Sequence, residues 1–263
     1  MTAQSGKQDD LNGAAPDNSP IALLLIDVVT DFEFPRGEEL YKCAVPIAPR
    51  IAALKKRARS AGVPVIYVND NFGRWRSNLN QLLDSCLQEG VRGRSFVEQL
   101  APDKQDYFVL KPKHSGFYQT PLEMLLKHLG AEQLIVTGLS TNSCVLFTAN
   151  DAYMRDLKLV VPPDCVAACT VKEHKSALDE MKNMMKAELT FSADIKLFWY
   201  LSPPGARAAK GGTSYDFRPQ PIYRSDYCCS RRERSRTQRS LNSILPRPPA
   251  CSCKAMGPSN DFW

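Results

Sequence analysis

The alternation of short apolar runs with longer amphipathic segments constrains the fold of this chain more than any other feature. Six runs have the length and apolar character of buried strands, at Ile21–Ile26, Pro64–Val68, Tyr107–Leu110, Gln133–Thr137, Lys158–Val161 and Glu188–Phe191. Five segments between them space their apolar residues as helices do, at Val45–Ala61, Leu79–Gln88, Pro121–Leu129, Asn142–Asp156 and Lys172–Met185. Because such strands join in parallel through right-handed helical crossovers, the pattern predicts an α/β fold whose sheet is covered on both faces.

Composition divides the chain into three parts. Residues 1–20 are polar and lack the basic and apolar regions of a secretory signal, so we expect a flexible N-terminal arm. Residues 21–200 form the predicted domain. Residues 201–263 carry 11 Lys and Arg against 4 Asp and Glu, are rich in Cys and Pro, and lack an apolar period, which predicts a disordered tail. The alternatives for this tail are nucleic-acid binding or an import signal through its Arg/Ser cluster, or a misassigned coding end.

The nine cysteines of the chain bear on its compartment. An odd count without a secretion signal favours thiols in a reducing environment, so we expect a cytoplasmic protein. In the tail, Cys228 adjoins Cys229 and one residue separates Cys251 from Cys253, spacings unlike those of zinc sites, so no metal is predicted there. No apolar run reaches the roughly 18 residues that span a bilayer, so no membrane association is predicted.

Three predicted strands end in groups of complementary chemistry. Asp27 follows the first strand, Lys111 ends the third, and Cys144 opens a helix-like segment after the fourth. Ligands of open parallel sheets bind outside the carboxyl ends of the strands, so these groups are candidates for a base, a cationic partner and a nucleophile. A helix N-terminus capped by Thr141 or Asn142 favours the Cys144 thiolate. Taken singly, each has a plainer interpretation: a turn cap, a solvated lysine and a buried small side chain.

The sequence around these residues resembles the isochorismatase-like cysteine hydrolases, which include nicotinamidases, N-carbamoylsarcosine amidohydrolases and isochorismatases. The matching motifs are Leu-Leu-Ile-Asp27-Val-Val-Thr-Asp-Phe, Lys111-Pro-Lys-His-Ser-Gly-Phe-Tyr-Gln-Thr-Pro-Leu and Thr-Gly138-Leu-Ser-Thr-Asn-Ser-Cys144-Val. The resemblance covers roughly residues 20–195. It implies a three-layer α/β/α sandwich around a six-stranded, mainly parallel, Rossmann-like sheet. It also implies a homo-oligomer.

By the same resemblance, Asp27, Lys111 and Cys144 form a catalytic triad. The Leu139–Ser140 peptide bond is expected to be cis, and the backbone N–H groups of Ser140 and Cys144 to form an oxyanion hole. Cys144 attacks a carbonyl, Asp27 takes the thiol proton and later returns it to the leaving amine, and Lys111 holds the charges. The resulting prediction is a cysteine hydrolase that forms an acyl-enzyme with a small amide, carbamoyl or ureido substrate. The alternatives are a vinyl ether hydrolase of the isochorismatase type and a catalytically silent binding or assembly module.

Metal ligands of nicotinamidases are not matched in this chain. Those enzymes carry an Asp-x-His motif after the second strand, where this sequence reads Asn69-Asp-Asn-Phe. The three histidines, His114, His128 and His174, do not have the spacing of metal ligands, so we expect no metal and no cofactor. His114 is instead expected in the wall of the pocket.

The other pocket candidates lie in the loops that follow the first three strands. They are Phe32, Asn69, Asp70, Trp75 and Phe117. For the loop after the second strand, the alternative is a structural role in which Trp75 covers the edge of the core. Many relatives carry Gln or Asn two or three residues after the aspartate, whereas this chain has Val29 and Thr30, so a substrate hydrogen bond is in doubt there.

Overall fold

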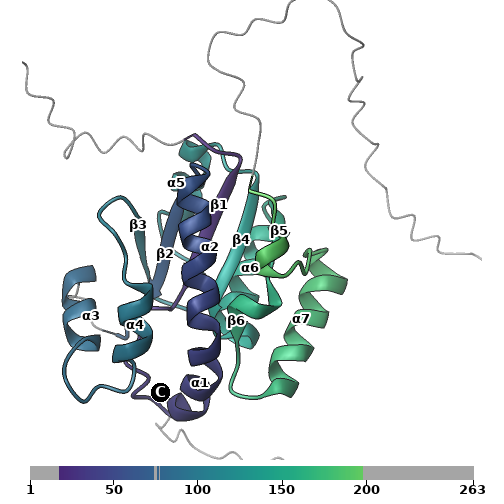
Figure 1. Cartoon of the computed structure of the whole chain (residues 1–263). Helices are drawn as coiled ribbons and strands as arrows, with labels where there is room; N and C mark the ends of the chain where they lie inside the picture. The colour runs from purple at the N-terminus through teal and green to yellow at the C-terminus, as the bar shows by residue number, and fades with distance from the viewer. Residues whose placement is uncertain (1–17, 74–75, 77, 198–263) are drawn as a thin grey trace, which may run out of the picture. The chain divides into compact units, whose positions relative to one another are not determined.

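The computed structural model describes residues 18–73, 76 and 78–197, in which six parallel strands form one sheet (Figure 1). The strands are β1 (Ile21–Ile26), β2 (Val65–Asp70), β3 (Tyr107–Lys111), β4 (Gln133–Leu139), β5 (Lys158–Val160) and β6 (Val166–Ala167). Their order is β3-β2-β1-β4-β5, and β6 pairs with the last residues of β4. The predicted α/β fold is therefore confirmed.

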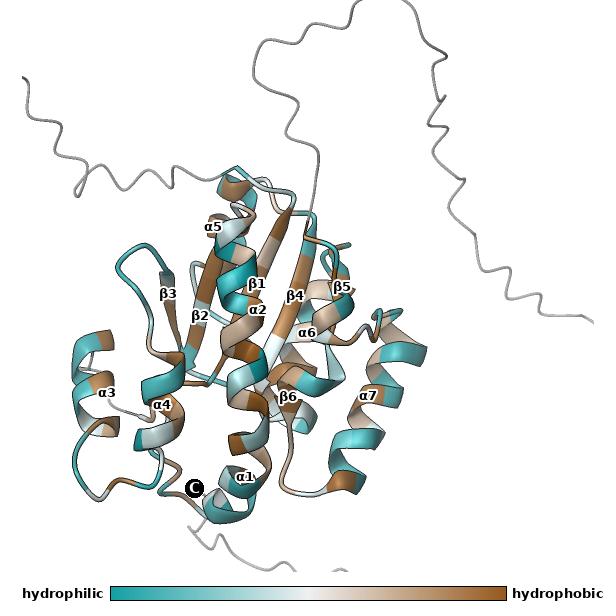
Figure 2. Cartoon of the chain, viewed as in Figure 1, coloured by the Kyte–Doolittle hydropathy of each residue, from teal (hydrophilic) through white to brown (hydrophobic). Residues whose placement is uncertain are grey.

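Helices cover both faces of this sheet (Figure 2). The core on one face contains residues of α1 (Gly37–Ala44), α2 (Ala48–Ser60), α3 (Leu79–Cys86) and α4 (Arg94–Leu100). The core on the other face contains residues of α5 (Leu122–Leu129), α6 (Leu146–Tyr153) and α7 (Val171–Met185). The result is a three-layer α/β/α sandwich.

The central strand β1 shows why its sequence is apolar throughout. All six of its residues are buried. Leu23 and Leu25 pack in the core on the α2 side, whereas Leu24 and Ile26 pack in the core on the α5 side, as the two-residue period of a strand requires. A strand buried on both faces has no polar side, and this distinguishes β1 from the strands of a sheet with one solvated face.

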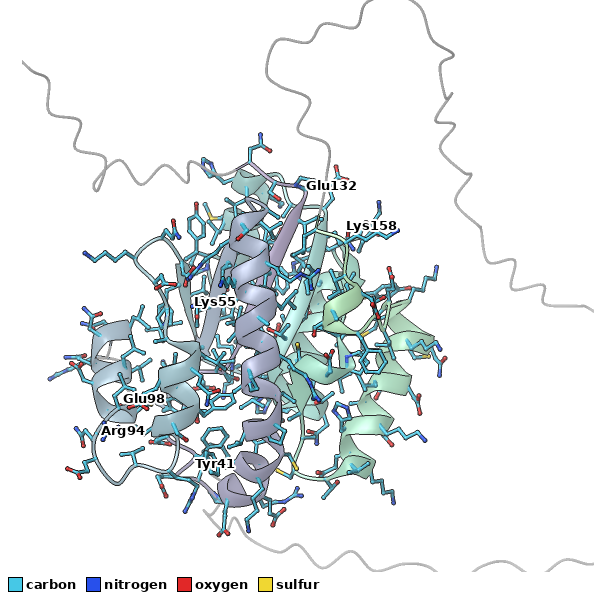
Figure 3. The ribbon with its side chains drawn as sticks, viewed as in Figure 1. Tyr41, Lys55, Arg94, Glu98, Glu132 and Lys158 are labelled. Atoms are coloured by element: carbon cyan, nitrogen blue, oxygen red, sulfur yellow. The ribbon has the colours of Figure 1, made fainter. Side chains whose placement is uncertain are left out.

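A charged residue ties the α2 layer to its surroundings. Lys55 of α2, labelled in Figure 3, is 6% exposed and donates to the Ala101 carbonyl oxygen at 2.6 Å. Its Nζ lies 3.3 Å from Asp106 and 5.1 Å from the centre of the Tyr67 ring. These contacts hold the segment after α4 against α2 and supply partners for a buried ammonium.

The sixth strand is not where the sequence placed it. The strand predicted at Glu188–Phe191 is wrong, because only Glu188 forms a bridge, to Val160. The backbone N–H and hydroxyl of Ser192 both donate to the Asp164 carboxylate, which draws the chain away from the sheet edge. The sixth strand is β6, whose two residues are too few to give a periodic signal.

Two short helices were also missed by the sequence pattern, α1 and α4. The helix predicted at Val45–Ala61 consists of two consecutive elements, a 3₁₀ turn at Val45–Ile47 and α2, and α1 ends directly before it at Ala44. Pro46 and Pro49 lie in the first turn of the 3₁₀ turn and of α2, respectively. Proline is tolerated at these positions because the N–H it lacks would have no partner inside the helix.

The beginning of the domain lies slightly before the predicted boundary at residue 21. Ser19 is completely buried, and its backbone N–H donates to Leu129 O at 2.9 Å. The carbonyl oxygen of Pro20 accepts hydrogen bonds from Glu132 and Gln133. Residues 18–20 are therefore part of the domain and not of an arm.

Several predictions lie outside the described residues. They concern residues 1–17, Trp75 and the tail from residue 198 onward. Among the described residues, no helix is both long and apolar enough to cross a membrane.

Candidate active site

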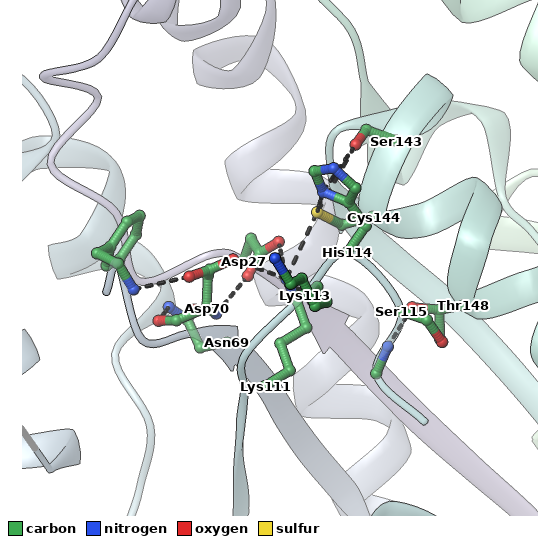
Figure 4. A network of polar contacts seen from close by, with 12 residues as sticks. Asp27, Asn69, Asp70, Lys111, Lys113, His114, Ser115, Ser143, Cys144 and Thr148 are labelled. Atoms are coloured by element: carbon green, nitrogen blue, oxygen red, sulfur yellow. Dashed lines mark hydrogen bonds and ion pairs between the residues drawn. The ribbon is translucent and has the colours of Figure 1, made fainter. Parts of the chain in front are cut away.

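Lys111 is the last residue of β3, and its side chain is fully buried. Its Nζ lies 2.9 Å from Asp27 Oδ2 and 3.4 Å from Asp70 Oδ2. The same Nζ donates to the Lys113 carbonyl oxygen at 3.2 Å and lies 3.4 Å from Cys144 Sγ (Figure 4). These four neighbours replace the water that the ammonium loses on burial.

Sheet topology brings these groups together. β1, β2 and β3 are parallel neighbours, so their carboxyl ends meet at one edge. Asp70 ends β2 directly beside Lys111, and Asp27 follows β1. The Asp27 backbone N–H donates to Val68 O at 3.0 Å, and its carboxylate accepts from the Asp70 N–H at 2.6 Å. The position of Asp27 is thus fixed through both its backbone and its side chain.

The turn that carries Cys144 depends on a glycine. Gly138, near the end of β4, has φ +104° and pairs with Ile26 of β1. A Cβ at this position would lie 2.0 Å from the Ile26 carbonyl oxygen. The peptide bond between Leu139 and Ser140 is cis, at the position that the resemblance implied. A π-helical turn then begins and carries Cys144.

The predicted capping of this turn is wrong. The π-helical turn spans Thr141–Val145, and its N-cap is Ser140, which makes no side-chain capping hydrogen bond. The Thr141 hydroxyl lies 3.0 Å from Nδ1 of His174 on α7 instead, and Asn142 is exposed. The turn is therefore held by a side chain from another element and not by a local cap.

The electrostatics of the cluster differ from the predicted thiolate. Burial, and then the Asp27 carboxylate, raise the pKa of the Cys144 thiol to about 12, although Lys111 opposes both. Burial also raises the pKa of Asp27 against the effect of Lys111. Burial opposes the charge on Lys111, but its interactions with Asp27, Cys144 and Asp70 outweigh this effect and raise its pKa. The sequence predicted that the helix terminus favours the thiolate, whereas burial and the neighbouring carboxylate shift the pKa of the thiol in the opposite direction.

Asp27 and Cys144 therefore hold one proton between them, next to a charged Lys111. The thiol donates a hydrogen bond to the carboxylate, which lowers the pKa of Asp27 relative to burial alone. Moving that proton from Sγ to Asp27 creates the thiolate without changing the net charge of the buried cluster. The arrangement can form a nucleophile by internal proton transfer, and it needs no external base for this step.

Three of the expected pocket residues belong to the core instead. Phe32 is completely buried and makes edge contacts with the rings of Tyr41 and Phe96, at 5.3 Å between centroids in each case. Phe117 is 5% exposed and packs in the core on the α5 side. Asn69 is completely buried, and its side-chain amide bonds both the N–H and the carbonyl oxygen of Val29. Asn69 thus fixes the loop after β1, and its amide is not directed at a substrate.

Two other expected pocket residues contact the cluster directly. Asp70 is the second carboxylate on Lys111, and its Oδ1 accepts from the Phe72 N–H at 2.7 Å. His114 is exposed and lies 3.7 Å from Cys144 Sγ through its Nδ1. The sequence indicated that both lie near the pocket, but not that they touch the catalytic candidates.

The contact between His174 and Thr141 was not predicted, because α7 and the turn are far apart in sequence and carry no shared motif. His174 is partly buried, and burial lowers the pKa of its imidazole. Among the described residues, no group of three or more His, Cys, Asp or Glu side chains is arranged to hold a metal ion.

Fold and site together define an α/β protein with a buried Asp–Lys–Cys cluster at the carboxyl edge of a parallel sheet. The model of the isochorismatase domain matches residues 21–194, so the chain belongs to the isochorismatase family and is a hydrolase. Asp27, Lys111 and Cys144 all lie within the matched segment.

The chain is similar to several curated relatives. It is 42% identical over 174 residues to the uncharacterized isochorismatase family protein YaaI of Bacillus subtilis, covering 66% of this chain and 95% of the relative. Enterobactin synthase component B of Escherichia coli is 32% identical over 160 residues, which is 60% of this chain and 56% of the relative. Ureidoacrylate amidohydrolase RutB of Methylorubrum extorquens is 31% identical over 142 residues, which is 45% of this chain and 56% of the relative.

Among solved structures, the N-carbamoylsarcosine amidase of Thermoplasma acidophilum is similar, with a TM-score of 0.53 and 27% identity. The match covers 68% of this chain and 99% of that structure. This chain spans only about half of the length of two of these curated relatives, the enterobactin synthase component and the ureidoacrylate amidohydrolase.

Proposed function

We propose that this hydrolase cleaves a small amide, carbamoyl or ureido substrate through an acyl-enzyme on Cys144. The observation that carries the proposal is the position of the Lys111 ammonium, 2.9 Å from the Asp27 carboxylate and 3.4 Å from the Cys144 sulfur. A nucleophile, a base and a cation in mutual contact are the groups that acyl transfer requires. The similarity to an N-carbamoylsarcosine amidase and a ureidoacrylate amidohydrolase supports the same substrate class.

In the proposed first step, Asp27 takes the Cys144 proton as the sulfur attacks the substrate carbonyl carbon. Lys111 remains charged and stabilises whichever of the two groups is anionic at that moment. The oxyanion of the tetrahedral intermediate is bound by the backbone N–H groups of Ser140 and Cys144, which lie on the turn after Leu139. Each such donor contributes about 3–4 kcal/mol in comparable sites.

Collapse of the intermediate expels the amine. Asp27 returns the proton to the leaving nitrogen, and the acyl group stays on Cys144 as a thioester. A water molecule then releases the acyl group. The thiol favours this acyl chemistry over the cleavage of a vinyl ether, because ether cleavage needs a proton donor but no nucleophilic sulfur.

The test is turnover of a panel of small amides, ureido compounds and carbamoyl amino acids by the wild type, Cys144→Ala and Asp27→Asn. We expect ammonia or amine release by the wild type, and a loss of at least 100-fold in both variants, the usual order for removing a nucleophile or a general base. Turnover that persists in Cys144→Ala but not in Asp27→Asn would instead support acid-catalysed cleavage of these compounds without an acyl-enzyme. If the wild type binds none of these compounds productively, the silent module is the better description.

Two further parts of the proposal concern the whole protein. We infer a cytoplasmic location, because an odd number of cysteines suits a reducing compartment. We also infer self-association, on the resemblance to a family whose members commonly form oligomers. Light scattering of the purified chain measures its mass in solution, and a monomer at micromolar concentration would contradict the second inference.

A further inference from the structure

The exposed side of the Cys144 sulfur has a partner that the proposed mechanism does not use. His114 Nδ1 lies 3.7 Å from Cys144 Sγ and 3.3 Å from the Ser143 hydroxyl oxygen. The imidazole stacks on the Phe147 ring, with 5.6 Å between the centroids and 21° between the planes. This stack fixes the orientation of the imidazole, so that a ring nitrogen and not the ring face is directed at the sulfur (Figure 4).

The sulfur therefore has two different sides. On the buried side, Lys111 is fully buried and the Asp27 side chain is 14% exposed. Those two groups also bond each other, the Asp70 N–H and the Lys113 carbonyl oxygen. On the other side, the His114 side chain is exposed. In Figure 4 the imidazole and the Lys111 ammonium lie on opposite sides of the sulfur.

The two steps of an acyl-enzyme mechanism place different chemical requirements on the buried and the exposed side of the sulfur. The first step moves a proton within the buried cluster and needs no water. The second step needs a water molecule to reach the thioester carbon, and that water comes from solvent. At 3.7 Å from Sγ, Nδ1 is about one water molecule away from a carbon bonded to that sulfur.

We propose that His114 is the general base of deacylation. The neutral imidazole, protonated on Nε2, accepts a proton at Nδ1 from the attacking water while the water oxygen bonds to the thioester carbon. The carbon–sulfur bond then breaks, the acid product leaves, and the sulfur takes the proton from Nδ1. Thiol, neutral imidazole and all charges return to their starting state, and no other reactant is needed. This inference rests on the proposed acyl-enzyme.

The assignment separates two roles that Asp27 would otherwise combine. Asp27 serves acylation, because it is in contact with the thiol proton and with Lys111. After the amine has left, Asp27 is a carboxylate whose oxygens accept from Lys111 and from the Asp70 N–H. His114 places Nδ1 at the exposed side of the same sulfur, so it is the better placed acceptor for a proton that arrives with solvent.

The test uses p-nitrophenyl acetate as the acylating probe on the full chain. Nitrophenolate leaves without needing a proton, so the initial burst measures acylation of Cys144 and the steady state measures deacylation. For His114→Ala we expect the burst rate of the wild type, a steady-state rate about 100-fold lower, and an acetyl adduct in the intact mass. Added imidazole should restore the steady-state rate, because the side chain it replaces is exposed, after the release of nitrophenolate by the same imidazole in the presence of Cys144→Ala is subtracted. His128→Ala, in the last turn of α5, is the control for loss of a histidine.

The outcomes that overturn the inference are distinct from those that overturn the proposed function. If His114→Ala keeps the wild-type steady state, or loses burst and steady state together without rescue by imidazole, His114 is not the base of deacylation. If Cys144→Ala shows the same burst and adduct as the wild type, there is no acyl-enzyme on Cys144, and the proposed function fails together with this inference.

Discussion

The Lys111 ammonium contacts two carboxylates and a thiol, so removing this charge tests both the stability of the fold and catalysis. In Lys111→Met, Asp27 and Asp70 lose their shared cation, and breaking such a buried ion pair typically costs about 3–5 kcal/mol of unfolding free energy. Activity should fall by at least 100-fold, because neither the thiolate nor the carboxylate is then stabilised. Denaturant unfolding and initial rates measure the two effects.

A neighbouring lysine provides the matched control. Lys113 is exposed and contributes only its backbone carbonyl oxygen to the cluster, so Lys113→Met should keep stability and activity near those of the wild type. In the double variant Asp27→Asn/Lys111→Met, part of the lost stability should return, because one of the two unpaired charges is gone. A double variant less stable than Lys111→Met would show that the pair is not the source of the loss.

The thiol gives a prediction about pH. Burial and Asp27 raise the pKa of Cys144 to about 12, so alkylation by iodoacetamide should be slow at pH 8 and should rise continuously toward pH 12. Asp27→Asn removes the neighbouring anion but leaves Lys111, so the pKa of Cys144 should fall and alkylation at pH 8 should accelerate. The measurement is the rate of mass increase at Cys144 against pH. An unchanged or slower rate in Asp27→Asn would show that Asp27 does not control the thiol.

For single residues, the sequence predicts which side chains meet at the site better than it predicts how deeply each one is buried. Asp27, Lys111 and Cys144 were expected together, because the carboxyl ends of parallel strands converge and the motifs match a family. The sequence did not indicate that burial would dominate the pKa of the thiol, since burial depends on residues packed from other elements. For the same reason Asn69 and Phe32 were expected in the pocket, although both are completely buried.

Among the elements, β4 has the strictest local requirement. Gly138→Ala would place a Cβ 2.0 Å from the Ile26 carbonyl oxygen at a φ of +104°, so either the strand pairing or the Cys144 turn must shift. We expect a loss of about 3 kcal/mol or more in unfolding free energy, from overpacking and backbone strain combined. Gly62→Ala is the control, because φ is +71° there but nothing lies within 4 Å, so only about 1 kcal/mol of strain is expected. Equal losses for the two variants would contradict the steric argument.

The contact between α7 and the catalytic turn is testable through pH. Burial lowers the pKa of His174 from its usual 6.5, so the folded state binds this proton less well than the unfolded state. The neutral His174 side chain therefore contributes its full stability above pH 6.5. This contribution is lost as the pH falls from 6.5 toward the lower pKa of the folded state, because protonation then favours the unfolded state. His174→Asn keeps a hydrogen-bonding group for Thr141 but does not titrate, so the variant should lose less stability than the wild type between pH 7 and pH 5. Parallel curves for the two proteins in urea titrations would disprove the linkage, and His128→Asn controls for the loss of a histidine.

Element prediction succeeded where a run was long and apolar. β1 and β4 were found because burial on both faces gives a continuous apolar run. β6 was missed because two residues carry no period, and α1 because its eight residues are short for a helical period. Glu188–Phe191 has the composition of a strand, but only Glu188 pairs with the sheet, through its bridge to Val160.

For the whole molecule, the question is which part of the 263-residue chain is needed. The domain model ends at residue 194, but Ile195 and Leu197 still pack in the core on the α2 side. Arg57 holds this segment by donating to the carbonyl oxygens of Ser192 and Ile195, each at 2.7 Å. A functional boundary should therefore lie at or after residue 197.

A chain of residues 18–197 should have the thermal midpoint and the turnover of the full protein, because it keeps both cores and every group of the cluster. Residues 21–197 should be less stable, since the buried Ser19 and its hydrogen bond to Leu129 O are lost. A chain that ends at residue 194 should also be less stable, since Ile195 and Leu197 are lost from the core.

Filter binding with single-stranded DNA at increasing salt tests whether the residues after 200 bind nucleic acid. With 11 Lys and Arg against 4 Asp and Glu after residue 200, any binding should require that segment and weaken steeply with salt. Equal DNA binding by a chain of residues 18–197 would contradict this expectation and place the contact on the domain. Loss of turnover in the same shortened chain would show that residues outside 18–197 take part in catalysis.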